Sequence, residues 1–214
     1  MDSQSNQTNA NSLRVLMVTP RYFPFMGGVE NHVYEVARRL ARRGVDITVL
    51  TTDTSGQLPT DERVDGIKIR RVRAWPAQRD YYFAPGIYRF IREGAWDIVH
   101  VQSYHTLVAP LAMFAARQAR IPYVLTFHGG GHSSQWRNTL RGVQWSLLRP
   151  LIARAKRLIA VAEFEIEFWG QRFGVPADRF VVIPNGADLP PLARSGREVS
   201  IGRPLIASIG RLER

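Results

Sequence analysis

The chain contains no cysteine among its 214 residues. This absence excludes disulfide bonds, thiolate metal ligands and cysteine nucleophiles. Lysine is nearly as scarce, because only Lys68 and Lys156 occur. No apolar run approaches the roughly 20 residues of a membrane-spanning helix, and the polar N-terminus lacks the apolar stretch of a signal peptide. We therefore expect a cytoplasmic protein with a disordered tail over residues 1–12.

The composition is that of a folded domain with a strong positive charge. Hydrophobic residues make up 45% and aromatic residues 10% of the chain, and the formal net charge is +11. Such a charge favours anionic partners such as nucleotide phosphates, lipid headgroups or nucleic acid. A coding bias toward arginine explains it equally well. The sequence carries no RNP-like, zinc or helix-turn-helix signature, so we expect no nucleic-acid partner.

Short β-rich apolar runs, typical of buried strands, alternate along the chain with apolar patterns of helical period. Strands are expected at 13–19, 45–53, 66–74, 96–103, 122–129, 157–162 and 180–184. Helices are expected from Val29 to just before Gly44, and at 86–94, 106–119, about 136–156 and 163–173. This alternation predicts an α/β fold, a doubly wound Rossmann-like parallel sheet with helices on both faces.

The end of the chain has a different character. Residues 13–189 form the predicted domain, and residues 190–203 have the proline, glycine and charge of a linker. Residues 204–214 repeat a buried-strand pattern followed by a glycine turn. They are interpreted as the first strand and loop of a second domain.

Glycines and polar residues follow several of the predicted strands, and ligands bind at that edge of an open α/β sheet. Gly27 and Gly28 end a proline-broken loop where a helix begins. They either let backbone N–H groups approach a phosphate or form a turn that needs positive φ. His128, followed by three glycines, is the strongest single candidate, and a histidine bonded to a loop carbonyl is its alternative.

Other polar positions have simpler explanations. His100 lies within a strand and is interpreted as a sheet-face histidine, and His105 is a possible helix cap. Glu163 is equally well a favourable carboxylate at a helix start. A dinucleotide site with Asp53 on a ribose is disfavoured, because G-x-G-x-x-G is absent and the glycine loop is long.

Residues 136–157 combine basic and apolar side chains without a single acid. One interpretation is an interfacial contact with an anionic membrane surface, at the inner face of the membrane. The other is a core helix with a solvated arginine face. The residues alone leave both open.

The motifs GGVENHV, TFHGG, VIPNGAD and SIGRL occur in this order. With them the chain resembles the family 4 glycosyltransferases of the GT-B fold, from Leu13 to Arg214. The resemblance implies two facing Rossmann-like domains, the first binding the acceptor and the second the nucleotide-sugar donor. It also implies transfer with retention of configuration to a lipid-linked or polysaccharide acceptor. No metal and no cofactor are implied, since the nucleotide sugar is a substrate.

The resemblance assigns roles to four residues. Gly27 and Gly28 match the glycine loop beside the donor phosphate and sugar, His128 the histidine at the transferred sugar, and Arg211 the arginine at the donor pyrophosphate. The remaining acceptor or cleft-lining candidates are Glu30, Asn31, Tyr104, His105, Gly129, Gly130, Glu163, Asn185 and Asp188.

Part of the family pattern is missing. A lysine after Arg211 and a pair of glutamates would lie beyond Arg214. We therefore expect the chain alone to be weakly active or inactive, whether it is a fragment or a natural half-enzyme completed by a partner chain. The alternative class is a non-catalytic module that binds nucleotide, lipid or a partner protein.

Overall fold

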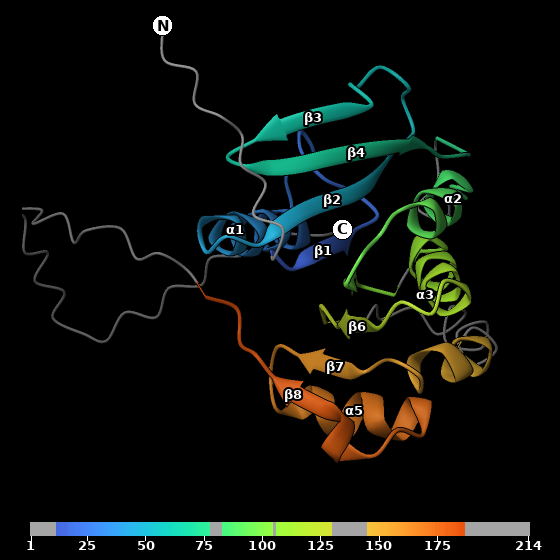
Figure 1. Ribbon diagram of the computed structural model, residues 1–214. Coiled ribbons are helices and arrows are strands. Elements are labelled where there is room, and N and C mark those ends of the chain that lie inside the picture. The colour runs from blue at the N-terminus through green and yellow to red at the C-terminus, as the bar shows by residue number, and fades with distance from the viewer. Residues whose placement is uncertain (1–11, 78–82, 105, 130–144, 187–214) are drawn as a thin grey trace, which may run out of the picture.

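The computed structural model describes residues 12–77, 83–104, 106–129 and 145–186, and these residues form one sheet flanked by helices (Figure 1). The sheet has eight strands in the order β3-β4-β2-β1-β5-β6-β7-β8. The strands are β1 (Arg14–Val18), β2 (Asp46–Asp53), β3 (Asp61–Val64), β4 (Ile67–Arg73), β5 (Ile98–Gln102), β6 (Tyr123–Thr126), β7 (Arg157–Ala160) and β8 (Phe180–Val182). The helices are α1 (Gly28–Arg42), α2 (Gly86–Glu93), α3 (Val108–Gln118) and α5 (Phe164–Phe173), with a short 3₁₀ turn at Ala177–Arg179.

The predicted doubly wound topology is confirmed. β1 pairs in parallel with both β2 and β5, so the chain builds one half of the sheet outward from β1 and then crosses to the other side. The switch point therefore lies between β1 and β5, and ligands bind at the carboxyl ends of the strands beside such a point. Only the β3–β4 pair is antiparallel within the described sheet. Strand β3 was missed, because its sequence DERV has no apolar alternation.

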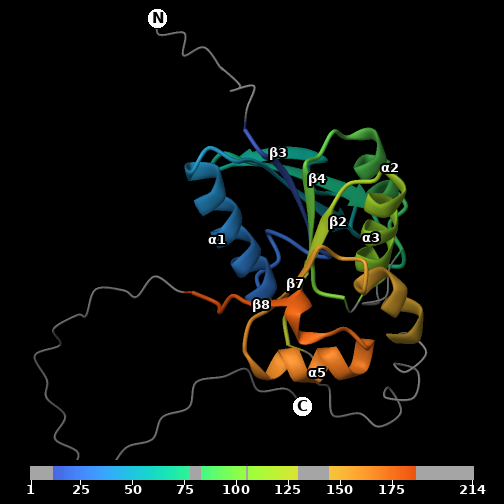
Figure 2. The ribbon, with the colours of Figure 1, turned by 60° about the horizontal axis from the view of Figure 1, so that its bottom comes forward.

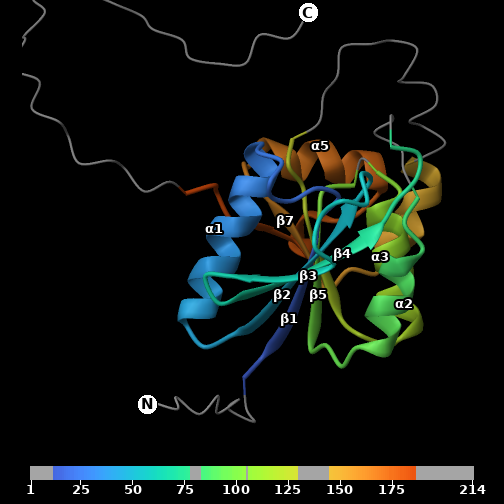
Figure 3. The same cartoon turned by 90° about the horizontal axis from the view of Figure 1, so that it is seen from above.

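The two faces of the sheet carry separate cores. Because successive strand residues point to opposite faces, Val15 and Met17 pack in the cluster under α1, while Leu16 and Val18 pack in the cluster under α2 and α3. Figures 2 and 3 show α1 on one side of the sheet and the α2–α3 pair on the other. Helix α5 adds its side chains to the larger cluster.

Helix ends follow the predicted signals. Gly44 has φ of +83° directly after the last turn of α1, and Gly174 with φ of +60° ends α5. Both positions favour a residue without Cβ.

The stretch 136–157 is described only from residue 145 onward, and residues 145–152 are helical. Leu148 and Ile152 are buried in the larger core, whereas Arg149 and Arg154 are exposed. The described part thus has a buried apolar face and an exposed face that carries Leu147 and arginines, which is compatible with both interpretations. The predicted linker at 190–203 and strand at 204–214 lie outside the described residues. The predicted tail at 1–12 does too, except for residue 12.

Candidate functional site

The glycine pair lies at the N-terminus of α1, at the carboxyl end of β1. Gly27 is the N-cap with extended φ of −153°, and the first helical bond runs from the Asn31 N–H to the Gly27 carbonyl at 3.1 Å. Neither glycine has a positive φ, so the turn alternative is wrong. A Cβ built on Gly28 would meet no atom within 4 Å. Gly27 and Gly28 are both exposed, and a helix N-terminus attracts an anion.

Glu30 places a carboxylate beside this helix end. Its carboxylate lies in the space that a side chain at position 27 would fill, and the N-cap residue Gly27 has no side chain that could cap the first turn. A carboxylate in the first turn is favourable for the helix. An anionic ligand at this end would displace it.

His128 lies at the end of β6, as predicted, and its ring is held from two sides. Its Nε2 is 2.7 Å from the Oε1 of Gln102, a fully buried residue at the end of β5. An amide oxygen accepts, so Nε2 carries the hydrogen in this assignment. The His32 ring of α1 meets the His128 ring edge-on, with 4.8 Å between the centroids. His128 thus joins β6 to the helix that begins at Gly28.

Asn185, another of the candidate residues, contacts His32. Its side chain hydrogen-bonds to His32, which raises the pKa of that histidine, but burial lowers it more and the net pKa is below the usual value. His32 was missed by sequence reasoning, although it follows the proposed Asn31 directly.

His100 is the sheet-face histidine that its strand position predicted. Its Nε2 lies 2.7 Å from the Thr126 Oγ1 on the neighbouring strand. Burial, with a smaller contribution from His32, lowers the pKa of His100 to about 4. His32 and His100 therefore present neutral imidazoles at neutral pH.

Gly129 has φ of +61° and donates its N–H to the Glu165 Oε1 at 3.0 Å. The other carboxylate oxygen accepts the Val161 N–H at 2.7 Å. Glu165 is only 1% exposed, and sequence reasoning overlooked it in favour of Glu163. A signal was present, since Glu165 lies one and two helical turns before Trp169 and Phe173 on the apolar stripe of α5.

Several candidates lie elsewhere. Tyr104 does not line a cleft: it is 4% exposed and packs edge-on against Phe127 and Trp169 in the core. Glu163 is exposed at the N-cap of α5. Asp53 is buried and accepts hydrogen bonds from Ser55 and from the Leu58 N–H, so it closes a loop. His105, Gly130, Asp188 and Arg211 fall outside the described residues.

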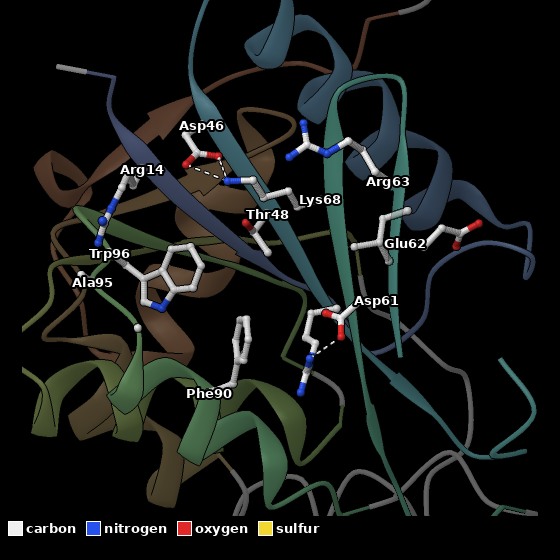
Figure 4. A pocket seen from close by; sticks show the side chains of 13 residues that line it. Arg14, Asp46, Thr48, Asp61, Glu62, Arg63, Lys68, Phe90, Ala95 and Trp96 are labelled. Carbon is white, nitrogen blue, oxygen red and sulfur yellow. Dashed lines mark hydrogen bonds and ion pairs between the residues drawn. The ribbon is translucent and has the colours of Figure 1, made fainter. Parts of the chain in front are cut away.

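A cavity of about 610 Å³ lies at the opposite, amino-terminal edge of the sheet (Figure 4). Phe90 and Trp96 form one wall, and the Lys68–Asp46 ion pair, at 2.7 Å, lies across from them. None of the predicted site residues lines it. The described residues hold no cluster of three His, Asp or Glu side chains suited to a metal. They also include no helix with the length and apolarity needed to cross a bilayer.

Comparisons with known proteins agree on one group. The family model for Glycosyltransferase Family 4 matches residues 26–190. The GDP-mannose:cellobiosyl-diphosphopolyprenol alpha-mannosyltransferase of Komagataeibacter xylinus is 29% identical over 85% of this chain and 46% of its own length. The phosphatidyl-myo-inositol mannosyltransferase of Mycolicibacterium smegmatis is 30% identical over 83% of this chain and 45% of its own.

The fold is similar to solved structures as well. The sucrose-phosphate synthase of Thermosynechococcus elongatus matches with a TM-score of 0.59 and 15% identity, over 82% of this chain and 49% of that one. The chain spans about half the length of the curated relatives it matches. The matched half has the α/β sheet described above, which is the predicted N-terminal half of a GT-B fold.

Proposed function

Because the chain belongs to glycosyltransferase family 4, we propose that it forms the acceptor-side half of a retaining enzyme. This enzyme transfers a sugar from a nucleotide-sugar donor to a lipid-linked or polysaccharide acceptor. One observation carries the proposal: His128 meets the helix that begins at the open glycine pair, at the carboxyl edge of the sheet. That edge is where an α/β sheet binds its ligand.

The proposed roles are those that the resemblance to family 4 assigns to these residues. The first N–H groups of α1 would donate to donor phosphate or sugar oxygens, and the absence of a side chain at Gly28 leaves room for that approach. His128 would hydrogen-bond to the transferred sugar. Arg211 would neutralise the charge that grows on the leaving diphosphate, the main electrostatic task of glycosyl transfer.

Exposed apolar side chains beside the same edge suit an acceptor with a lipid portion. Met26, directly before the glycine pair, is 82% exposed, and Phe25 beside it is also exposed. Trp75 and Phe83, which follow β4, are each about half exposed. Exposed large apolar groups gathered at one edge are typical of a binding surface. The two relatives' names specify a diphosphopolyprenol and a phosphatidyl-inositol acceptor.

We place the protein in the cytoplasm, in peripheral contact with the inner membrane face through residues 136–157. Leu147, 70% exposed, and Arg149 support this contact from the described part. The donor-binding half would begin at 204–214 after the linker 190–203 and continue in residues or a partner chain that this sequence lacks. No metal and no cofactor take part in the proposed reaction.

The test supplies the missing half. Purified chain 1–214 is incubated with a separately expressed donor-side domain of family 4, a radiolabelled donor such as GDP-mannose or UDP-glucose, and membrane lipid extract. We expect transfer only when both halves are present, and a fall of about 100-fold in His128→Ala. His100→Gln, which lies deeper in the sheet, is the matched control. Donor binding or lipid binding without any transfer would instead support the non-catalytic module.

A further inference from the structure

The residues on both sides of His128 are held by one helix. Before it, the Phe127 ring stacks on the Trp169 ring of α5, with 5.0 Å between centroids and 13° between planes. After it, the Gly129 N–H donates to the Glu165 carboxylate of the same helix. Helix α5 thus contacts the chain immediately before and immediately after the histidine.

Glu165 also joins two strand ends. Its Oε1 accepts from Gly129 after β6, and its Oε2 accepts from Val161 after β7, at 3.0 and 2.7 Å. These N–H groups lie where two parallel neighbours leave the sheet, so the ladder no longer supplies acceptors for them. A buried carboxylate satisfies both at once, and hydrogen bonds to a charged acceptor are among the stronger ones.

The geometry of the imidazole depends on this anchor. The His128 Nε2 hydrogen bond to Gln102 spans 2.7 Å, and such a bond weakens steeply with changes in distance or angle. Gly129 turns the chain with φ of +61°, a conformation that the sheet does not impose. Without the Glu165 bond this turn would be free to shift, and the imidazole with it.

We propose that Glu165 is a positioning residue, which holds the main chain at Gly129 so that the His128 ring stays hydrogen-bonded to Gln102 in a single tautomer. The significance for sugar transfer rests on the proposed function. The orientation of the imidazole does not, because it is a property of the chain without any ligand.

The test reads the imidazole directly. Two-bond ¹H–¹⁵N spectra of histidine-labelled chain 1–214 report the tautomer of each ring, and His128→Gln assigns the His128 signals. We expect one tautomer for His128 in the unchanged chain and an averaged pattern in Glu165→Gln, because an amide offers one acceptor oxygen in place of two. Glu167→Gln is the matched control, since Glu167 is exposed on the same helix and bonds only to Gln171 among the described contacts.

The outcomes separate positioning from a general loss of structure. The His100 pattern, fixed by Thr126, should stay unchanged in Glu165→Gln. An unchanged His128 pattern, or equal changes at His100 and His128, would overturn the proposal. If Glu165→Gln does not fold, Glu165→Asp takes its place under the same criteria, since the shorter carboxylate keeps the charge but cannot reach both strand ends.

An activity measurement with the donor-side domain adds a second readout. Glu165→Gln should lower transfer about tenfold in the unchanged background and cause no further loss in His128→Ala. Equal losses in both backgrounds would show that Glu165 acts independently of His128 and would refute the positioning role. If transfer is absent from every sample while the spectra change as expected, the proposed function fails and the positioning role stands.

Discussion

His100 should make the stability of the fold fall as the pH drops below neutrality. Its pKa is lowered from the usual 6.5 to about 4, chiefly by burial and to a smaller extent by His32. Below pH 6.5 the unfolded chain binds a proton at this position and the native chain does not, so acid favours the unfolded state.

The magnitude follows from the two pKa values. One pKa unit corresponds to about 1.4 kcal/mol, and the full penalty develops between pH 6.5 and pH 4. Between pH 7 and pH 5 the histidine should lower the free energy of unfolding by about 2 kcal/mol. His100→Gln removes the titrating group. The glutamine amide can still reach the Thr126 Oγ1 that now lies 2.7 Å from the imidazole Nε2.

The assay is urea unfolding followed by tryptophan fluorescence at pH 7, 6 and 5. We expect the variant to match the unchanged chain at pH 7 and to lose about 2 kcal/mol less by pH 5. His32 also has a lowered pKa, but it is present in both proteins and its contribution largely cancels in the difference. If the free energy of unfolding falls equally with pH in both proteins over this interval, the neutral imidazole of the partly buried His100 is not the cause.

Three further changes test other parts of the structure. Gly28→Leu should leave the melting temperature unchanged, because a Cβ there meets no atom within 4 Å, but should abolish transfer in the two-part assay; retained transfer would remove the glycine pair from the site. Gly129→Ala should cost about 1 kcal/mol in urea unfolding, because its φ of +61° strains any L-residue with a side chain. Trp169→Ala should cost about 3–5 kcal/mol, since the indole is fully buried between aromatic rings, and a loss below 1 kcal/mol would contradict that packing.

The fold was predictable because a parallel sheet buries both faces of its strands. Such strands read as nearly continuous apolar runs, and β1 (RVLMV) is of this kind. The hairpin partner β3 was not predictable on the same basis, because it lies at the sheet edge and is polar along its length. Its pairing is decided by the adjacent turn at Asp65 and Gly66, both with positive φ, and not by an apolar pattern.

The sequence places candidate residues only where they follow a predicted strand. His128 and Asn185 were proposed in this way, because topology brings parallel strand ends to one edge, and the structure places both beside His32. Glu165 was missed as a candidate, since its partner Gly129 is 36 positions away and a single sequence does not specify contacts at that separation. The aromatic packing that buries Tyr104 was hidden for the same reason.

The groups gathered around His128 also indicate how the work of the proposed enzyme is divided. His32 has a lowered pKa, and Glu30 places a carboxylate beside the α1 N-terminus. A neutral imidazole and a carboxylate can orient hydroxyl groups, but they cannot neutralise a leaving diphosphate, which requires cations or helix N–H groups. The N–H groups at the α1 N-terminus supply only part of this neutralisation, and the Glu30 carboxylate competes for the same N–H groups. We therefore expect this half to orient the sugar and acceptor, with Arg211 and the donor-side half providing the positive charge.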